Sequence, residues 1–213
     1  MERCGWATPS DPLYVSYHDS EWGVPLYEER ALFELLCLEG AQAGLSWRII
    51  LHRREGYRRA FLGFDPERLA GLGDADLTRL QADVGIVRNR QKIASVQKNA
   101  QALLAMRAGG ERFSQLVWSF VDGRPQIHDY AQLRDVPAHT PESDALSREL
   151  RARGFSFVGS TICYAFMQSA GLVMDHVVNC FRHEELKGYA PRLHSARRDA
   201  KRPPSQPRRR PSA

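Results

Sequence analysis

The chain has 213 residues, of which 43% are hydrophobic, so it can bury the core of one sizeable domain or of two small ones. Its formal charge of +5 is uneven: the stretch from Arg192 onward holds eight basic residues and one acidic residue, which leaves about −2 for the rest. The sequence has no apolar run of about eighteen residues and no apolar signal segment at its start, which predicts a soluble intracellular protein without a membrane partner.

Residues 1–27 are rich in aromatic side chains, proline and glycine, and they carry few helix signals. We expect an irregular arm that packs on the body through its aromatic residues. The arm contains Cys4 and His18, and cysteines of an intracellular protein favour metal binding or plain burial over disulfides. A metal clip would fasten such an arm; the alternative is a histidine satisfied by ordinary hydrogen bonds.

The stretch Leu38–Trp47 lies between two predicted helices, at residues 28–37 and 46–61. Glu39 would then sit where an apolar helix ends. A carboxylate there must be exposed, paired or placed for a ligand, because an unpaired buried charge is costly. The spacing alone favours a solvated glutamate beside a helix–helix turn.

Further helices are predicted along the rest of the chain, which places it in the all-α class. Asp65, followed by a proline and an acid, is a typical helix start. A terminal stretch rich in proline and arginine should be disordered, which predicts a domain of residues 1–190 and a basic tail of residues 191–213. The remaining helices are expected at residues 74–83, 88–106, 113–120, 140–153, 158–170 and around 175–180, with an irregular segment at 126–137.

A hairpin is predicted at Val84–Val87, between the helices at 74–83 and 88–106. A tight turn containing Gly85 can present backbone N–H groups and a helix N-terminus to a phosphate. Arg88, Asn89, Arg90 and Lys92 bring donors and positive charge to the same end. The alternative is an ordinary helix pair in which Gly85 ends the first helix.

His176 and Cys180 are four residues apart, which on a helix places both on one side. Together with Cys4 and His18 they form a set of two thiols and two imidazoles, which suits tetrahedral zinc. The alternative is a set of buried thiols and exposed imidazoles without a metal.

Six short motifs stand out along the chain: Cys4-Gly5-Trp6, Tyr17-His18-Asp19, Leu38-Glu39-Gly40, Leu45-Ser46-Trp47, Trp118-Ser119-Phe120 and Asp175-His176-Val177-Val178. Together they resemble the 3-methyladenine DNA glycosylase I family, bacterial enzymes of the helix-hairpin-helix superfamily. The resemblance extends from residue 1 to residue 180. Beyond it, relatives often end in cysteines, whereas this chain continues with Phe181-Arg182-His183 and the basic tail.

The resemblance implies a helix-hairpin-helix fold at about residues 74–106, whose N-terminal arm and C-terminal helix are clipped together by one structural zinc ion. It also implies hydrolytic removal of N3-methyladenine from double-stranded DNA in the bacterial cytoplasm, by a monomer whose main carboxylate at the base is Glu39. The alternative is a zinc-containing protein that binds damaged DNA without cutting it. The residues concerned are Cys4, His18, His176 and Cys180 for zinc; Tyr17, Trp22, Glu39 and Trp47 for the base; and Gln42, Leu45, Gly85, Ile86, Arg88 and Arg90 for DNA.

These residue types suit the chemistry. Adenine methylated at N3 is cationic, so aromatic faces attract it more than normal adenine, by about 0.5–2 kcal/mol per contact. An anionic acceptor such as Glu39 strengthens that preference, and the base must leave the duplex to reach such a pocket. Many relatives in the wider superfamily carry an aspartate after the hairpin helix, and some add a lysine nucleophile. The corresponding residues 111–119 offer Glu111 but no Asp or Lys, so the resemblance implies a monofunctional enzyme that uses water as its nucleophile.

Overall fold

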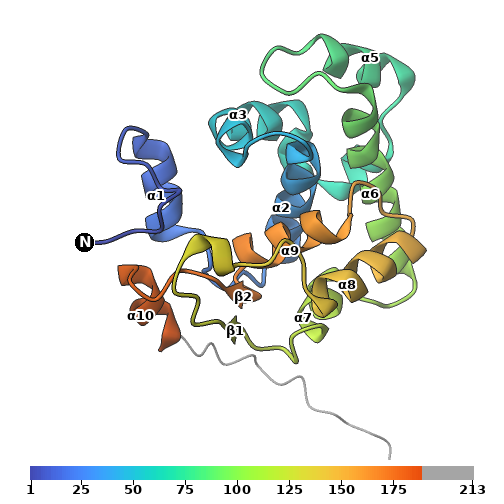
Figure 1. Cartoon of the computed structure of the whole chain (residues 1–213). Coiled ribbons are helices and arrows are strands. Elements are labelled where there is room, and N and C mark those ends of the chain that lie inside the picture. The colour runs from blue at the N-terminus through green and yellow to red at the C-terminus, as the bar shows by residue number, and fades with distance from the viewer. Residues whose placement is uncertain (189–213) are drawn as a thin grey trace, which may run out of the picture.

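The computed structural model describes residues 1–188; the predicted boundary at residue 190 and the predicted tail at 191–213 lie outside the described residues. Within residues 1–188 the chain is mostly helical, as the all-α prediction states, and no helix is long and apolar enough to cross a bilayer. The helices are α1 (Pro12–Ser20), α2 (Glu29–Gln42), α3 (Trp47–Ala60), α4 (Pro66–Ala70), α5 (Asp74–Ala82), α6 (Arg90–Ala108), α7 (Phe113–Ser119), α8 (Pro141–Ala152), α9 (Ser160–Ser169) and α10 (Phe181–Lys187), with 3-10 turns at Leu62–Phe64 and Leu133–Asp135 (Figure 1).

The core is built around α2, which packs against α9, α3, α6 and α7. Its residues Leu32, Phe33 and Leu36 are fully buried, because the apolar positions of this helix face neighbours on several sides. In Figure 1, α1 and α10 lie together at one end of the molecule, whereas α5 and the start of α6 lie at the other. The two ends of the described chain therefore meet far from the hairpin.

The N-terminal arm is not irregular, so that prediction is wrong. Asp11 accepts a hydrogen bond from the backbone N–H of Tyr14, and Pro12 occupies the first helical position, which together start α1. The dense aromatic and proline content concealed this cap. The helix carries Tyr17 and His18 on its buried side.

His176 and Cys180 do not lie on one helix, which corrects the second prediction. His176 follows strand β2 (Val173–Met174), which pairs in parallel with β1 (Gln126–Ile127) inside the segment predicted to be irregular. Beyond the strand, the backbone N–H of Val178 donates to the carbonyl of Tyr130, so it is not available for a helical bond. Cys180 is the residue before α10.

Two other boundaries differ in ways that matter for the site. Helix α2 continues to Gln42, so Glu39 lies inside its last turn. Helix α6 begins at Arg90 and not at Arg88, because the side chain of Asn89 caps it by accepting from the backbone N–H of Lys92. The pair α5 and α6 with its connecting turn has the predicted helix-hairpin-helix order.

Candidate functional site

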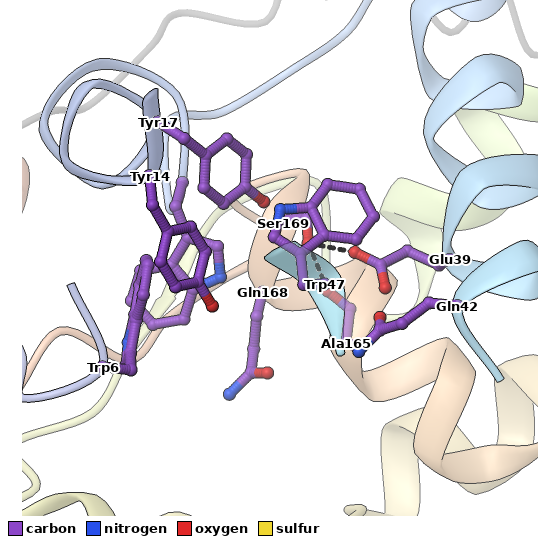
Figure 2. Close-up of a pocket in the computed structure, with 10 residues that line it drawn as sticks. Trp6, Tyr14, Tyr17, Glu39, Gln42, Trp47, Ala165, Gln168 and Ser169 are labelled. Atoms are coloured by element: carbon purple, nitrogen blue, oxygen red, sulfur yellow. Dashed lines mark hydrogen bonds between the residues drawn. The ribbon is translucent and has the colours of Figure 1, made fainter. Parts of the chain in front are cut away.

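Aromatic side chains surround a cavity of about 190 Å³ between α1, α2 and α9 (Figure 2). The rings of Trp6 and Trp22 pack edge to face with their centroids 5.1 Å apart, and the ring centroids of Tyr17 and Trp47 are 5.5 Å apart. The sequence-predicted residues Tyr17, Trp22, Glu39 and Trp47 therefore come together in one cavity. Its lining consists of Trp6, Tyr14, Tyr17, Trp22, Glu39, Gln42, Trp47, Ala165, Gln168 and Ser169.

Glu39 is buried, with 1% of its surface exposed, so its interpretation as a solvated helix-end residue is wrong. Since α2 continues past it, the side chain turns inward. One carboxylate oxygen, Oε1, accepts a hydrogen bond of 2.5 Å from the hydroxyl of Ser169. The other, Oε2, is buried and has no hydrogen-bond partner. Burial raises the pKa of Glu39 to about 8, and the Ser169 hydrogen bond offsets part of that rise.

A second polar atom of the pocket lacks a partner. The indole nitrogen of Trp47, the first residue of α3, is buried and makes no hydrogen bond. Leaving a buried donor or acceptor unsatisfied costs about 1–3 kcal/mol. An unmatched donor and an unmatched carboxylate oxygen in one aromatic cavity are features of a site that a ligand completes.

The four predicted metal ligands converge from both ends of the described chain. The donor atoms of Cys4, His18, His176 and Cys180 lie within 4.8 Å of one another, and all four residues are buried. The imidazoles are therefore buried, and not exposed as the alternative supposed. The hydrogen bond from Cys4 and those of the two imidazoles lower the pKa of the Cys180 thiol, which favours the thiolate form that binds metals.

In both histidines, the ring nitrogen that faces away from the cysteines is held by a hydrogen bond. The other ring nitrogen therefore faces the two thiols. His18 uses Nδ1 to bond Asp19 at 2.7 Å, and Asp19 is held in turn by the guanidinium of Arg3. His176 uses Nε2 to donate to the carbonyl of Trp22 at 3.0 Å. Such outer hydrogen bonds are typical of histidines that ligate metals. The donor set, its closeness and its outer contacts fit a four-coordinate zinc ion.

The cluster also supports the wall of the pocket. The ring of Trp22 meets that of His176 edge to face at 4.6 Å, in addition to the hydrogen bond from His176 to its carbonyl. Gly23 follows with φ of +79°, and a Cβ there would lie 3.2 Å from the His176 ring. Only glycine fits this turn without strain, so the Cys/His cluster and the aromatic wall are closely packed.

The hairpin lies at the other end of the molecule, and α3 fixes it in place. A Cβ on Gly56 of α3 would lie 2.3 Å from the carbonyl oxygen of Gly85, so the two backbones are in direct contact. The hydroxyl of Tyr57 accepts from the backbone N–H of Val87, and the side chain of Ile86 is buried in the core. Ile86 thus anchors the hairpin through its side chain, and only its backbone can face a partner.

The donors of the hairpin are only partly available. The N–H of Gly85 already bonds the Asp83 carboxylate at 2.7 Å, whereas those of Ile86 and Arg88 make no hydrogen bond within residues 1–188. Arg88 and Arg90 are exposed. Lys92, grouped with these donors in the sequence, instead donates to the carbonyls of Ala41 and Ala43 at the end of α2.

The end of α2 and the turn that follows it carry the two residues predicted to enter DNA. Gln42 lines the pocket, and Leu45 follows Gly44, whose φ is +75°. The side chain of Leu45 is 37% exposed although it is apolar. An exposed apolar side chain beside the mouth of a cavity can enter a space that another group leaves.

Sequence reasoning missed five lining residues: Trp6, Tyr14, Ala165, Gln168 and Ser169. Trp6 and Tyr14 were recognised as aromatic but not assigned to the pocket. Ser169 and Gln168 were missed altogether, although two polar residues near the end of the apolar helix α9 were a usable signal. Their role depends on the contact of Ser169 with Glu39, 130 residues away, and on that of Gln168 with Asp175 beyond the end of α9, which helical spacing does not reveal.

The chain is similar to known proteins over most of its length. Residues 6–183 match the family model described as methyladenine glycosylase. DNA-3-methyladenine glycosylase 1 of Escherichia coli is 53% identical over 180 residues, covering 84% of this chain and 96% of that protein.

Solved structures give the same result. A crystal structure of 3-methyladenine DNA glycosylase I matches with a TM-score of 0.83 and 54% identity, over 84% of this chain and 98% of the other. A structure of the Staphylococcus aureus enzyme, solved to explain its recognition of 3-methyladenine, matches with a TM-score of 0.80 and 39% identity, over 84% and 95% of the two chains.

Proposed function

The chain belongs to the methyladenine glycosylase family, and we propose that it removes N3-methyladenine from alkylated double-stranded DNA by hydrolysis of the N-glycosidic bond. The observation that carries the proposal is the buried carboxylate of Glu39, which has one unpartnered oxygen in a cavity lined by aromatic rings. A cationic planar base offers what this cavity lacks: positive charge, hydrogen-bond donors and a face for stacking.

The selectivity of such a pocket follows from charge. Normal adenine is neutral, so it gains little from the aromatic faces and would leave Glu39 without a compensating charge. The methylated base is cationic and stabilises the ionised form of Glu39, whose pKa in the free protein is raised to about 8. The base reaches the cavity by rotating out of the duplex, and Gln42 and Leu45 are placed to fill the vacated space.

The chemistry needs little help from the protein. When the bond between C1′ and N9 breaks, its electrons return to the purine and cancel the positive charge. Water adds its oxygen to C1′ and releases one proton to solvent. The bound carboxylate of Glu39 lies beside the leaving base, so it orients the base in the pocket, and no second carboxylate is required.

The four ligands Cys4, His18, His176 and Cys180 would hold one structural zinc ion, since protein atoms fill all four positions. When bound, the ion would cross-link α1 to the segment before α10. This link would hold Trp22 and Tyr17 in the wall of the pocket, so the role of the four ligands would be structural.

We assign non-specific DNA contacts to the hairpin of Gly85, Ile86, Arg88 and Arg90. The free N–H groups of Ile86 and Arg88 and the exposed guanidinium groups suit phosphate oxygens, which position a protein without reading sequence. We further infer that the protein acts as a monomer in the cytoplasm, and that residues 1–190 form the glycosylase domain.

The experiment that tests the proposal is release of the base. Purified protein is mixed with N-methylated duplex DNA, and free N3-methyladenine is measured by chromatography. The parent should release it, and the Glu39→Gln variant should do so far more slowly. A parent that binds methylated DNA but releases no base would overturn the proposal in favour of the alternative, a protein that only binds damage.

A further inference from the structure

Lys92 lies on the hairpin helix α6 but has no part in the functions assigned above. The sequence groups it with Arg88 and Arg90 as a donor for phosphate, whereas in the structure its side chain reaches the end of α2. Its Nζ donates to the carbonyl of Ala41 at 2.9 Å and to that of Ala43 at 2.5 Å. Lys92 therefore connects the hairpin helix to the segment at the mouth of the pocket.

The position of Lys92 is unfavourable for its own helix. It is the third residue of α6, and the positive end of the helix dipole opposes a cation in the first turn. The side chain is half-buried, and this burial lowers the pKa of Lys92. For α2 the same ammonium group is favourable, because the last carbonyls of a helix lack partners within it and carry the negative end of its dipole. Lys92 thus serves the contact between α6 and α2.

The turn between α2 and α3, residues 43–46, has little else to hold it. The backbone N–H of Leu45 donates to the carbonyl of Gln42 at 2.6 Å, which fixes these two residues to each other. Ser46 precedes α3 without a side-chain capping bond. In the described part of the chain, Lys92 is the one side chain that hydrogen-bonds to the backbone of this turn. It therefore sets where the turn lies relative to the hairpin.

The turn needs such a support when a base leaves the duplex. Unstacking a base costs a few kcal/mol, and the side chains that fill the vacated space must keep their place between the neighbouring base pairs. The hairpin contacts phosphates at the N-terminal end of α6, and Lys92 ties the same end of this helix to the turn. Its two hydrogen bonds make the phosphate contacts and the inserted side chains parts of one rigid unit.

We propose that Lys92 is a positioning residue for base release, which holds the turn of residues 43–46 in a fixed place relative to the hairpin. Gln42 and Leu45 then enter the duplex at the point that the phosphate contacts of the hairpin define. Lys92 acts through the turn and touches no reacting atom. The inference rests on the proposed function, because it concerns the base that leaves the duplex in that reaction.

The first test is the rate of base release from methylated duplex DNA in single turnover. Lys92→Met keeps the length of the side chain and removes the donor, so the rate should fall about tenfold, as for lost hydrogen bonds of a charged group. Lys98→Met, an exposed lysine of the same helix, is the matched control and should release the base at the rate of the parent.

Two affinities separate positioning of the turn from damage to the pocket or to the hairpin. Calorimetry with protonated, cationic 3-methyladenine reports the pocket, and anisotropy with an undamaged duplex reports the hairpin. Both affinities of Lys92→Met should stay within about twofold of the parent while base release falls. A loss of either affinity as large as the loss in rate would overturn the inference, since Lys92 would then support the pocket or the hairpin itself.

A double-mutant cycle tests whether Lys92 acts through Leu45. Leu45→Ala removes the inserted side chain, so adding Lys92→Met to it should slow release by much less than the same change does in the parent. An equal factor in both backgrounds would overturn the inference, because the two residues would then act independently.

A second variant keeps the test open if Lys92→Met does not fold. Lys92→Gln retains a donor on a shorter side chain and should slow release by a smaller factor, about threefold. Release at the parental rate in a folded variant without the ammonium group would overturn the inference and leave the proposed function intact. A parent protein that releases no N3-methyladenine would instead overturn the proposed function.

Discussion

The base pocket and the hairpin satisfy their polar groups in opposite ways. In the pocket, a carboxylate oxygen of Glu39 and the indole nitrogen of Trp47 are buried without partners. At the hairpin, the N–H groups of Gly85 and Val87 are bonded internally, and the charged groups of Arg88 and Arg90 are in solvent. The polar atoms of the pocket thus gain partners only when a particular ligand binds. The hairpin needs no ligand for its internal hydrogen bonds, and its arginines can contact any phosphate.

The difference separates selectivity from general affinity. An unsatisfied buried group costs free energy that only the right partner returns, which makes it a source of discrimination. Exposed arginines contact phosphates of every sequence alike. Changes in the two regions should therefore affect different measurements.

The largest effect is expected from a change in the cluster of Cys4, His18, His176 and Cys180. Such a change should disrupt the pocket and leave the hairpin intact. Cys180→Ser should lose bound zinc and lower the free energy of unfolding by several kcal/mol, because metal affinity contributes to folding. Atomic absorption measures the zinc content, and thermal melting measures the loss of stability. Cys163→Ser, a buried cysteine outside the cluster, is the control and should retain its zinc. A parent purified without chelators that contains no zinc would contradict the site.

The next effect concerns base release. Glu39→Gln keeps the size of the side chain and removes its charge, so release of N3-methyladenine should fall by about 100-fold or more. Binding of undamaged DNA at low salt should stay unchanged, since the hairpin is remote. If the variant binds protonated, cationic 3-methyladenine as tightly as the parent in calorimetry, the charge of Glu39 is not what selects the base.

The dependence of stability on pH should also distinguish the pocket. The folded pKa of Glu39 is raised to about 8 from an ordinary value of 4.5, so the folded state holds its proton more tightly than the unfolded state. Stability is then fully present below pH 4.5 and is lost as the pH rises towards 8, by at most about 1.4 kcal/mol per pH unit. In urea titrations the parent should lose stability relative to Glu39→Gln across this range. A constant difference would show that Glu39 is ionised throughout.

Lys92 joins the two regions and should give an intermediate result. It lies on the hairpin helix α6 and donates to two carbonyls at the end of α2. Lys92→Met removes these bonds, which should loosen the turn that holds Gln42 and Leu45 and slow base release about tenfold. The measurement is the rate of base release from methylated duplex DNA, which depends on the turn. Release from single methylated nucleosides would not test it. Lys98→Met, on the same helix, is the control.

The smallest effect is expected at the hairpin surface. Arg88→Ala should weaken binding of methylated and unmethylated duplexes by the same small factor and reduce the salt dependence by about one unit of slope. Fluorescence anisotropy at several salt concentrations measures both. A loss confined to methylated DNA would place Arg88 at the damaged base and not at a phosphate.

The sequence was informative where local chemistry determined the outcome. The cap at Asp65 starts α4 as predicted, because its side chain accepts a hydrogen bond from the backbone N–H of Arg68. The residues of the pocket and the cluster were assigned through the resemblance, and they do lie together. Local pattern failed at α1, where aromatic residues obscured a good cap, and at His176, whose spacing imitated a helix.

What could not be predicted depends on contacts between distant segments. Ser169 lies 130 residues from Glu39, and the two meet only because α9 packs on α2. The orientation of Gln168 depends on Asp175, which in turn depends on the pairing of two-residue strands too short to be recognised in the sequence. The same applies to Lys92, whose basic character suggested phosphate although its partners are carbonyls.

The cluster has a consequence for the order in which the protein becomes functional during synthesis. Cys4 and His176 are 172 residues apart, and in a chain-entropy description a cross-link over that span stabilises the fold by about 5 kcal/mol. Cys4 and His18 are translated first, whereas His176 and Cys180 are translated near the end of the described chain. Zinc would thus be captured only by a nearly finished polypeptide. A prematurely terminated product would lack His176 and Cys180, and with them the fastening of its aromatic wall.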